Sequence, residues 1–410
     1  MPILLQINSV ADFGSTGHIA EEIGQLAINN GWQSNIAFGR EKRFSKSNLI
    51  KIGTGWDIIQ HVLITRLFDR HGFGSKRATF ELINIINKLN PDIIHLHNIH
   101  GYYINIEILF NYLSNVNIPV VWTLHDCWTI TGHCSWFDFI GCRKWETGCF
   151  SCPQKKKYPS SLILDNSKIN YFEKSKLFNS VNNLTIIPVS IWLSNILKKS
   201  FLKNHPSKVI NNGLNLKIFT PQENDKAVRL KLGVFDQFMI IGVTSIWEKR
   251  KGLGDFHKLS KLIDKSMIIV LVGLNEKQIK DLPSNIIGIT RTDNISQLVE
   301  IYSAADLFLN LTYEDNFPTT NIESLACGTP ILTYNTGGSI EAVSHDTGFI
   351  VEKGDLSGIM NAIAIVKKKG KFSYSTACRN RAVKLYNKND RYQEYIELYN
   401  LLLNPENNNK

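Results

Sequence analysis

The sequence has no long apolar run and no leader-like start. Nowhere in its 410 residues does an apolar stretch approach the roughly 18–20 residues that a membrane-spanning helix requires. Met1–Asn8 contain no basic residue, and polar side chains interrupt their apolar stretch, which predicts a first buried strand rather than a signal peptide. We therefore expect a cytoplasmic protein.

Long runs of one charge are also missing. The longest basic runs, Lys155–Lys157, Lys249–Lys251 and Lys367–Lys369, are too short for a nucleic-acid arm. The formal net charge of +10 still favours an anionic partner, unless it only reflects a chain rich in Asn, Ile and Lys. Only Lys249–Lys251 follows a predicted strand. A phosphorylated substrate is therefore expected there, and nucleic acid is not expected as a partner.

The composition is that of a globular protein, with 43% hydrophobic and 20% charged residues. A chain of 410 residues is comfortable for two domains of about 150–200 residues each. Short apolar runs alternate with helix-period segments, and the pattern occurs twice. It predicts an α/β protein with two doubly wound parallel sheets, each covered by helices on both faces. The expected strands are Ile3–Ile7, Asn35–Phe38, Ile93–Leu96, Val120–Leu124, Leu184–Val189, Met239–Val243, Met267–Val272, Ile286–Ile289, Leu307–Leu311 and Ile331–Thr333.

The boundary between the two halves is expected near Val209–Pro221, where turn residues separate two periodic regions. A short strand is expected to end there at Asn212-Gly213. The predicted organisation is a first domain at 1–208 with a cysteine-rich loop at 127–152, a linker at 209–221, a second domain at 222–387, and a C-terminal helix with a polar tail at 388–410.

Residues that directly follow strands are candidates for a binding site, because ligands of open parallel sheets lie beyond the carboxyl ends of the strands. Gly14, Ser15, Thr16 and Gly17 follow the first strand and open a helix. Such small residues let backbone N–H groups approach an anion or a sugar hydroxyl. A plain strand–helix turn explains them equally well, since the motif is not a full dinucleotide fingerprint.

Histidines cluster after two further strands of the first half. His97 follows Ile93–Leu96, and His125 with Asp126 follows Val120–Leu124. An imidazole can donate a hydrogen bond to a sugar hydroxyl or a diphosphate, and it titrates near neutral pH. A single histidine is usually structural, but the gathering of these residues on one predicted sheet edge favours a role in a cleft.

In the second half, Lys249–Lys251 precede Gly252, which opens a helix after the strand Met239–Val243. Cations in this position are suited to neutralising a diphosphate leaving group. A solvated basic turn is the alternative interpretation.

The most informative stretch begins at Glu314, after the strand Leu307–Leu311. A proline turn leads into a helix, so the amides near Pro318–Asn321 lie at a helix N-terminus, where a phosphate can bind. Glu323 lies about one turn inside that helix. Two carboxylates flanking an anion site suit the hydroxyl groups of a sugar and a ribose, whereas plain helix capping by Glu314 or Asp315 is the alternative.

These segments resemble the family 4 retaining glycosyltransferases of the GT-B fold. In the second half the resemblance rests on EDNFPTTNIESLACGTPI from Glu314, TGGSIEAV from Thr336 and TGFIVEKGD from Thr347. In the first half, DIIHLHNIHGYYIN from Asp92 and TLHDCWTITGHCSWF from Thr123 are similar to a bacterial branch that builds surface polysaccharides of the colanic-acid type.

The resemblance implies two Rossmann-like domains facing a central cleft. It implies transfer of a sugar, with retention at the anomeric carbon, from a nucleotide-diphosphate donor to a hydroxyl of a glycan or a lipid-linked oligosaccharide. Attack occurs on the face that the diphosphate leaves, the diphosphate takes the acceptor proton, and no cofactor is required for the step. The rival interpretations are a sugar-nucleotide epimerase of the same architecture and a non-enzymatic, lectin-like or scaffold protein.

The resemblance also implies roles for individual residues. Glu323 holds the donor ribose, Glu314 contacts the transferred sugar, and Lys251 binds the diphosphate. His125 faces the donor sugar. The other implied contacts are Phe317, Pro318, Thr319 and Thr320 with sugar and phosphate, Thr290 and Arg291 with the base, and Gly14–Gly17 with the cleft.

Two departures from the family pattern leave assignments open. The family spaces its two acids as Glu-x7-Glu, whereas eight residues separate Glu314 from Glu323 and seven separate Asp315 from Glu323. Either Glu314 or Asp315 therefore takes the first acidic, catalytic role. The family's arginine upstream of the phosphate-binding lysine is also missing, and Arg250 or Lys249 is its substitute.

Four cysteines lie in one loop: Cys134, Cys142, Cys149 and Cys152, separated by seven, six and two residues. Disulfides are not expected in a reducing cytosol, and four thiols in one loop suit a structural, tetrahedral zinc ion. Because only one C-x-x-C pair is present, reduced loop cysteines are the alternative.

Contact with an anionic membrane that carries a lipid-linked acceptor is a further hypothesis, and it would bring the protein to the inner face of the plasma membrane. It rests on basic residues that lie near apolar ones in the first domain. These are Lys155–Lys157, and Lys198, Lys199 and Lys203 beside Trp192, Ile196 and Phe201. The alternative is that the helix Ile191–Leu202 buries its apolar side against the first sheet.

Overall fold

The computed structural model describes residues 1–223 and 225–404, which form two compact units. The first unit comprises Met1–Asn211 together with the chain from Asn389 onward, and the second comprises Asn212–Lys388. Residues 405–410, which hold most of the predicted polar tail, lie outside the described residues.

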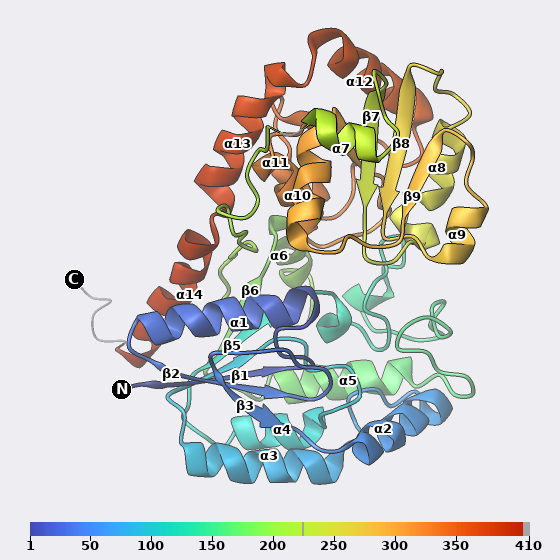
Figure 1. The fold of residues 1–410 in the computed structure, drawn as a ribbon. Coiled ribbons are helices and arrows are strands. Elements are labelled where there is room, and N and C mark those ends of the chain that lie inside the picture. Colours follow the sequence, from blue (N-terminus) through green and yellow to red (C-terminus); the bar gives the residue numbers. More distant parts are fainter. Residues whose placement is uncertain (224, 405–410) are drawn as a thin grey trace. The chain divides into compact units, whose positions relative to one another are not determined.

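The first unit contains a six-stranded parallel sheet with the strand order β3-β2-β1-β4-β5-β6 (Figure 1). Its strands are β1 (Ile3–Asn8), β2 (Gln33–Phe38), β3 (Asn48–Lys51), β4 (Ile93–Leu96), β5 (Val120–Leu124) and β6 (Leu184–Pro188). Its helices are α1 (Gly14–Asn29), α2 (Gly55–Phe68), α3 (Lys76–Leu89), α4 (Ile106–Leu113), α5 (Ser167–Phe178), α6 (Ile191–Leu197) and α14 (Lys388–Leu403).

Helices cover both faces of the first sheet. Because successive side chains of a strand point to opposite faces, Leu4 and Leu5 of β1 belong to different cores. Leu4 packs with residues of α1 and α14, whereas Leu5 packs in a larger core with residues of α3, α4 and α5. Figure 1 shows α1 and α14 on one side of this sheet and α3 and α4 on the other.

The second unit repeats the architecture with the strand order β12-β11-β10-β7-β8-β9, again entirely parallel. Its strands are β7 (Phe238–Val243), β8 (Met267–Val272), β9 (Ile286–Ile289), β10 (Leu307–Asn310), β11 (Ile331–Tyr334) and β12 (Gly348–Val351). Its helices are α7 (Asp225–Lys231), α8 (Leu253–Leu259), α9 (Glu276–Lys280), α10 (Ile295–Ala304), α11 (Thr319–Ala326), α12 (Leu356–Lys369) and α13 (Phe372–Tyr386).

Each sheet has a point at which the direction of strand addition reverses. This point lies between β1 and β4 in the first sheet and between β7 and β10 in the second. Ligands of doubly wound sheets bind in the crevice beyond the carboxyl ends of the strands at such a switch point. The topology therefore directs attention to the segments that follow these four strands.

The predicted fold class, two doubly wound parallel sheets, is confirmed, but three strand assignments differ. The edge strands β3 and β12 were missed, because edge strands are short and part-exposed and lack an uninterrupted apolar run. The strand expected to end at Asn212-Gly213 is present only in part. The segment is not a regular strand, but the backbone N–H groups of Lys208 and Ile210 donate to the carbonyls of Ile186 and Pro188 in β6 at 3.2 and 3.3 Å, and Ser207 forms a parallel bridge with Ile186. Ile210 also packs in the same core as residues of α14.

Candidate active site

The segments that follow β7 and β10 are joined at the switch point of the second sheet. The backbone N–H of Tyr313 donates to the carbonyl of Arg250 at 2.7 Å, and the Thr312 hydroxyl donates to the same carbonyl at 3.3 Å. The basic turn Lys249–Lys251 is thus fixed against the segment that leads to α11.

Two glycines allow this close packing. Gly252 has a φ of +79°, and a Cβ atom there would lie 2.1 Å from the carbonyl oxygen of Leu311. Gly337, in the loop after β11, has a φ of +51°, and its Cβ would lie 1.8 Å from the carbonyl oxygen of Asp315. Any side chain would force the three loops apart, since both positions also have a backbone conformation that favours glycine.

The two charges predicted to lie at the anion site are in direct contact. Lys251 Nζ lies 2.5 Å from Asp315 Oδ2, and both side chains are partly exposed. The guanidinium of Arg250, the predicted substitute for the family's arginine, lies 3.4 Å from Glu248 instead. Lys251 is therefore a cation that the structure brings together with the acidic segment after β10.

Glu323 lies in the first turns of α11, and a side chain of α10 fixes its carboxylate. The hydroxyl of the fully buried Tyr302, on α10, donates to Glu323 Oε2 at 3.0 Å. Burial raises the pKa of Glu323, and the hydrogen bonds from Tyr302 and Thr319 oppose this. A carboxylate fixed in this way is well suited to accept hydrogen bonds from ligand hydroxyls.

The N-terminus of α11 is supported by a polar network. Asn310 Nδ2 donates to Asn321 Oδ1 at 2.7 Å, and Asn321 Nδ2 donates to the carbonyl of Ser339 at 2.9 Å. The cap residue Pro318 makes no side-chain cap, so the first amides of α11 have no capping oxygen from it. These amides can therefore donate hydrogen bonds to an anion that binds at the helix N-terminus.

The remaining predicted donor residues divide into two groups. Phe317, Pro318, Thr319 and Thr320 all lie at the start of α11, with Phe317 buried and packed near the ring of Tyr386. Thr290 and Arg291 follow the edge strand β9, which β8 separates from β7, and both side chains are exposed. No described contact connects this pair to Glu323 or Lys251.

The two competing acids differ in their surroundings. Glu314 is buried, whereas Asp315 is partly exposed and contacts Lys251. The carboxylate of Asp315 thus lies next to Lys251, the residue predicted to bind the diphosphate.

At the switch point of the first sheet, Gly14, Ser15, Thr16 and Gly17 form the first turn of α1. No side chain caps this helix, and Gly14 has open space around it. Gly17 is buried, and a Cβ there would touch Val10 and the backbone of Asp12. The predicted small-residue turn is therefore present after β1, the strand that pairs with β4.

Those histidines form a chain of neutral imidazoles. His97 Nδ1 lies 3.2 Å from His125 Nε2, and His97 Nε2 lies 3.0 Å from Gln6 Oε1. Behind them, His95 contacts the hydroxyls of Thr123 and Tyr399 at 2.8 and 2.6 Å. Burial lowers the pKa of His125 to about 4 and those of His95 and His97 well below their usual value.

Asp126 is engaged by its neighbours. Its carboxylate lies 2.9 Å from His100 Nε2 and accepts the Trp128 backbone N–H at 2.9 Å. Burial alone would raise the pKa of Asp126, but these two contacts outweigh it and lower the pKa. His97, His125 and Asp126 therefore lie together at one sheet edge, with His97 almost fully buried and the other two partly exposed.

The four loop cysteines share one small cavity of about 20 Å³, and none is in a disulfide. The Gly132 N–H donates to Cys149 Sγ at 3.2 Å. His133, whose Nε2 is buried without a hydrogen-bond partner, lines the same cavity. Across residues 1–223 and 225–404, however, no three side chains of His, Cys, Asp or Glu are arranged to hold a metal ion. Structural zinc at Cys134, Cys142, Cys149 and Cys152 stays a prediction, to be tested by metal analysis under reducing conditions.

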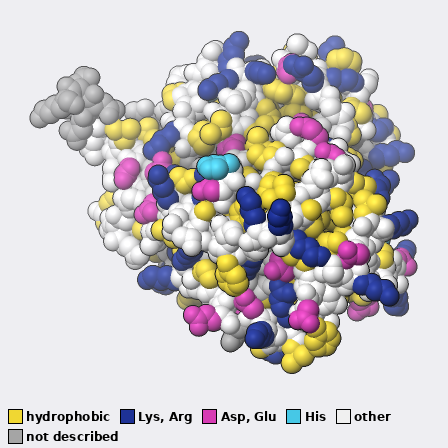
Figure 2. Space-filling model, turned by 90° about the horizontal axis from the view of Figure 1, so that it is seen from above, with side chains coloured by type: hydrophobic (Ala, Val, Ile, Leu, Met, Phe, Trp, Pro, Cys, Tyr) yellow, Lys and Arg dark blue, Asp and Glu magenta, His cyan; other side chains and the backbone are white. Residues whose placement is uncertain are grey.

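The apolar residues named for membrane contact lie on α6 and in the turn after it. Ile196 is buried, and the partly buried Trp192 and Phe201 pack against the core of the first unit. This packing favours the alternative interpretation, that the segment buries its apolar side, and membrane contact through Lys155–Lys157, Lys198, Lys199 and Lys203 stays a prediction. Figure 2 shows Lys and Arg side chains spread among apolar and uncharged ones on one face of the molecule, without a single basic stripe.

Three residues that matter at these sites were missed from the sequence. Tyr302 supports Glu323, His95 supports His97, and the buried Lys174 of α5 donates to the carbonyls of Trp128 and Thr131 beneath the cysteine loop. Each lies on a regular element at an apolar-looking or unremarkable position. The only available signal was a histidine within the apolar run of β4.

Comparison with known proteins adds a consistent picture. A model described as Glycosyltransferase Family 4 matches residues 36–218, and one described as Glycosyl transferases group 1 matches residues 237–367. The chain is 22% identical to WcaC of Escherichia coli, described as a colanic acid biosynthesis glycosyl transferase, over 97% of this chain and 99% of that protein.

Two solved structures illustrate the similarity in fold. A sucrose-phosphate synthase from Thermosynechococcus elongatus is 17% identical with a TM-score of 0.74, covering 99% of this chain and 100% of that chain. HepE from Anabaena, in complex with UDP-glucose, is 15% identical with a TM-score of 0.65, covering 97% and 98%. These likenesses show the GT-B fold, and nothing in them supports an epimerase or a non-enzymatic protein.

Proposed function

The chain belongs to the family 4 glycosyltransferases of the GT-B fold, and we propose that it transfers a sugar, with retention at the anomeric carbon, from a nucleotide-diphosphate donor to an acceptor hydroxyl. The acceptor is a glycan or a lipid-linked oligosaccharide of bacterial surface polysaccharide synthesis, as the name of its relative WcaC suggests. The reaction takes place on the cytoplasmic side of the membrane.

The observation that carries this proposal is the arrangement at the second switch point. A cation, Lys251, a carboxylate, Glu323, and the uncapped N-terminus of α11 lie beyond the ends of neighbouring strands. The cation and the helix amides suit a diphosphate, because both present positive charge or N–H donors to an anion. Glu323, held by Tyr302, suits the hydroxyls of the donor ribose.

In the proposed reaction the bond between the anomeric carbon and the diphosphate oxygen breaks, and a bond to the acceptor oxygen forms on the same face. The acceptor proton passes to the departing diphosphate oxygen. Retaining hydrolases instead place a carboxylate nucleophile on the opposite face. Here the chain contributes positioning and charge stabilisation, since Lys251 and the amides of α11 neutralise the leaving group and no metal is required for the step.

We assign the first acidic role to Asp315 in preference to Glu314. Asp315 is partly exposed and contacts Lys251 at 2.5 Å, so it orients the cation that is proposed to bind the diphosphate. Glu314 is buried. Neutral His125 acts as a hydrogen-bond partner of a sugar hydroxyl.

The decisive variant is Glu323→Ala. It should lose nucleotide-sugar affinity and transfer together, by about 100-fold, without change in the circular dichroism spectrum. Glu276→Ala, an exposed glutamate of α9, is the matched control and should behave as the parent protein. Unchanged turnover in Glu323→Ala would contradict the assignment of the site.

The donor is best identified by a thermal-shift panel of UDP-, GDP-, dTDP- and ADP-sugars. The nucleotide that stabilises the protein most should also be the one released during turnover. Release of free nucleotide only when an acceptor is present excludes an epimerase, which needs no second substrate.

A further inference from the structure

Helix α2 of the first unit buries polar side chains and exposes apolar ones, which is the reverse of an ordinary surface helix. Its buried residues, Asp57, His61 and Thr65, are all polar and recur every four positions. Surface helices normally bury their apolar stripe and expose their polar one. This helix therefore needs two explanations, one for the buried polar face and one for the exposed apolar face.

The buried polar face is fully hydrogen-bonded. Asp57 caps the helix with Thr54, and His61 contacts the Ser75 hydroxyl at 2.9 Å and accepts the Gly72 N–H at 3.0 Å. Thr65 Oγ1 donates to the carbonyl of His61 at 2.9 Å. These bonds fix the orientation of the helix, because rotating it would leave buried polar groups unpaired.

The opposite face of α2 is apolar and exposed to solvent. Trp56, Ile59, Leu63 and Leu67 recur at spacings of three and four residues, so they form one stripe along the helix. The exposed fraction is 74% for Trp56 and 52% for Leu63. Exposed stripes of this size on a soluble domain usually mark a contact surface.

A neighbouring loop extends the stripe. The backbone N–H groups of Leu162 and Leu164 donate to the carbonyls of Arg66 and Leu67 at 2.8 and 3.2 Å, which lays this loop along the end of α2. The side chains of Leu162, Ile163 and Leu164 are all exposed. We call Trp56, Ile59, Leu63, Leu67 and Leu162–Leu164 the α2 face.

Basic side chains border the α2 face. They are Arg66 on α2, Lys76 and Arg77 at the start of α3, which line a pocket with Trp56, and Lys155, whose Nζ donates to the carbonyl of Ile163 at 3.0 Å. Three acids lie among them. Asp57 and Glu81 contact Arg77 at 3.4 and 3.8 Å, and Asp165 accepts hydrogen bonds from Ser167 and Cys152. These contacts leave the carboxylates charged, so the rim of the face carries a small surplus of positive charge.

We propose that the α2 face is a docking surface for an anionic lipid bilayer, with the apolar stripe inserted at the level of the headgroups and the basic rim on the lipid phosphates. Trp favours the interface between headgroups and acyl chains, and each basic residue near an anionic surface adds attraction. No helix within residues 1–223 and 225–404 is long and apolar enough to cross a bilayer, so the contact is peripheral.

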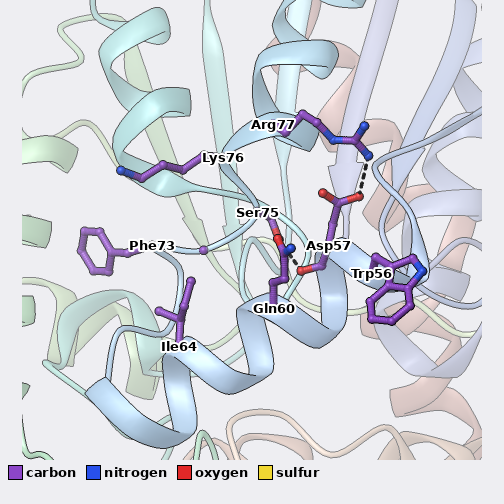
Figure 3. Close-up of a pocket in the computed structure, with 9 residues that line it drawn as sticks. Trp56, Asp57, Gln60, Ile64, Phe73, Ser75, Lys76 and Arg77 are labelled. Atoms are coloured by element: carbon purple, nitrogen blue, oxygen red, sulfur yellow. Dashed lines mark hydrogen bonds and ion pairs between the residues drawn. The ribbon is translucent and has the colours of Figure 1, made fainter.

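A pocket beside the stripe fits the same ligand chemistry. It has a volume of about 460 Å³ and is lined by residues of α2 and of the start of α3. Figure 3 shows Trp56 and Gln60 on one helix, Lys76 and Arg77 on the other, and the ion pair between Arg77 and Asp57 between them. The pocket offers room for a phosphate-bearing headgroup next to Lys76 and the ion pair of Arg77 with Asp57.

The test uses the full-length protein and sedimentation with sucrose-loaded vesicles, in the absence of donor and acceptor. The parent protein should bind vesicles of phosphatidylglycerol and phosphatidylcholine, bind pure phosphatidylcholine at least tenfold more weakly, and lose affinity as salt rises. The double variant Ile59→Gln, Leu63→Gln should lose at least tenfold in affinity. Both side chains are exposed, so this variant should keep the parent melting temperature.

The matched control is Leu230→Gln, Leu262→Gln, which changes two exposed leucines of the second unit and should bind vesicles as the parent does. Transfer to a water-soluble acceptor should be unchanged in both double variants, so failure of the docking proposal is distinguishable from failure of the proposed function. Absence of binding to anionic vesicles, or equal binding by the parent and the Ile59→Gln, Leu63→Gln variant, would overturn the proposal. A dimer in light scattering that this variant abolishes would also overturn it, by assigning the face to a second copy of the chain.

Discussion

The two sheets have the same strand order, yet the residues beyond their switch points differ in kind. In the second unit, charged groups gather: Lys251, Asp315 and Glu323 lie around the N-terminus of α11. In the first unit, the equivalent segments carry the uncharged imidazoles of His97 and His125, held neutral by burial, and one carboxylate, Asp126, in contact with His100. One topology thus supports two chemistries, an anion site on one sheet and a histidine-rich hydrogen-bonding surface on the other.

The variant Lys251→Ala gives the strongest test of whether the anion site lies in the second unit. The substitution removes the cation at the anion site and leaves Asp315 without its partner, so turnover should fall by about 100- to 1,000-fold. Initial rates at saturating acceptor measure the effect. Lys265→Ala, an exposed lysine of the same unit, is the control. Near-normal turnover in Lys251→Ala would mean that the diphosphate does not bind at the second switch point.

A smaller effect is expected for Tyr302→Phe. This change removes one hydrogen bond to the Glu323 carboxylate and nothing else, so the affinity for nucleoside diphosphate should fall by about tenfold. Titration calorimetry measures it, and Tyr374→Phe, a buried tyrosine elsewhere in the second unit, serves as the control. Equal affinities for both variants would indicate that Glu323 does not depend on this support.

Because its buried histidines are neutral, we expect acidification to lower the stability of the first unit against unfolding. As the pH falls, an imidazole whose pKa is lowered by folding takes up its proton in the unfolded chain at a higher pH than in the folded one. Acid therefore favours the unfolded state. The free energy of unfolding falls between pH about 6.5 and the folded pKa, by up to about 1.4 kcal/mol per pH unit for each group. The lowered histidines are His61, His71, His95, His97, His125 and His205, against the single raised His133.

Thermal unfolding between pH 7.5 and 5 tests this expectation, and the melting temperature should fall by several degrees. Hydrogen exchange, corrected for its intrinsic pH dependence, should place the loss in peptides of the first unit. A melting temperature that is constant or rises on acidification would contradict the assignment of neutral imidazoles.

The smallest effect is expected in the pH profile of catalysis. Because burial lowers the pKa of His125 to about 4, its protonation should leave no limb in kcat/KM between pH 5.5 and 8. His125→Gln, which keeps a hydrogen-bonding side chain, should therefore change the rate but not the shape of the profile. A limb near pH 6.5 that disappears in His125→Gln would show that the imidazole is charged during the reaction.

The sequence predicted the elements that have a strong local pattern. Central strands such as β4 and β5 are uninterrupted apolar runs, and the candidate sites follow them because strand ends position ligands. The edge strands β3 and β12 lack that pattern, and α2 carries apolar residues on its exposed side, so its helical period was not recognised. What local pattern cannot encode is which side of an element faces the core.

Contacts between residues far apart in the sequence could not be predicted either. The pairing of Lys251 with Asp315 joins residues 64 positions apart, and that of His95 with Tyr399 joins residues 304 positions apart. The choice between Glu314 and Asp315 depended on the first of these contacts, because spacing alone allowed both. Long-range partners are fixed by the assembled sheet, which a single sequence does not reveal.

Helix α14 contributes Tyr395 and Tyr399 to the first unit, where they contact Thr123 and His95. The polypeptide that begins with β1 therefore completes its own core only with the last helix of the chain, after the whole second unit has been synthesised. On the ribosome, the first unit must wait with one sheet face covered by α1 but not yet by α14, while the second unit can already close. A chain cut short before Asn389 would leave that face partly uncovered, so premature termination near the C-terminus should damage the N-terminal unit first.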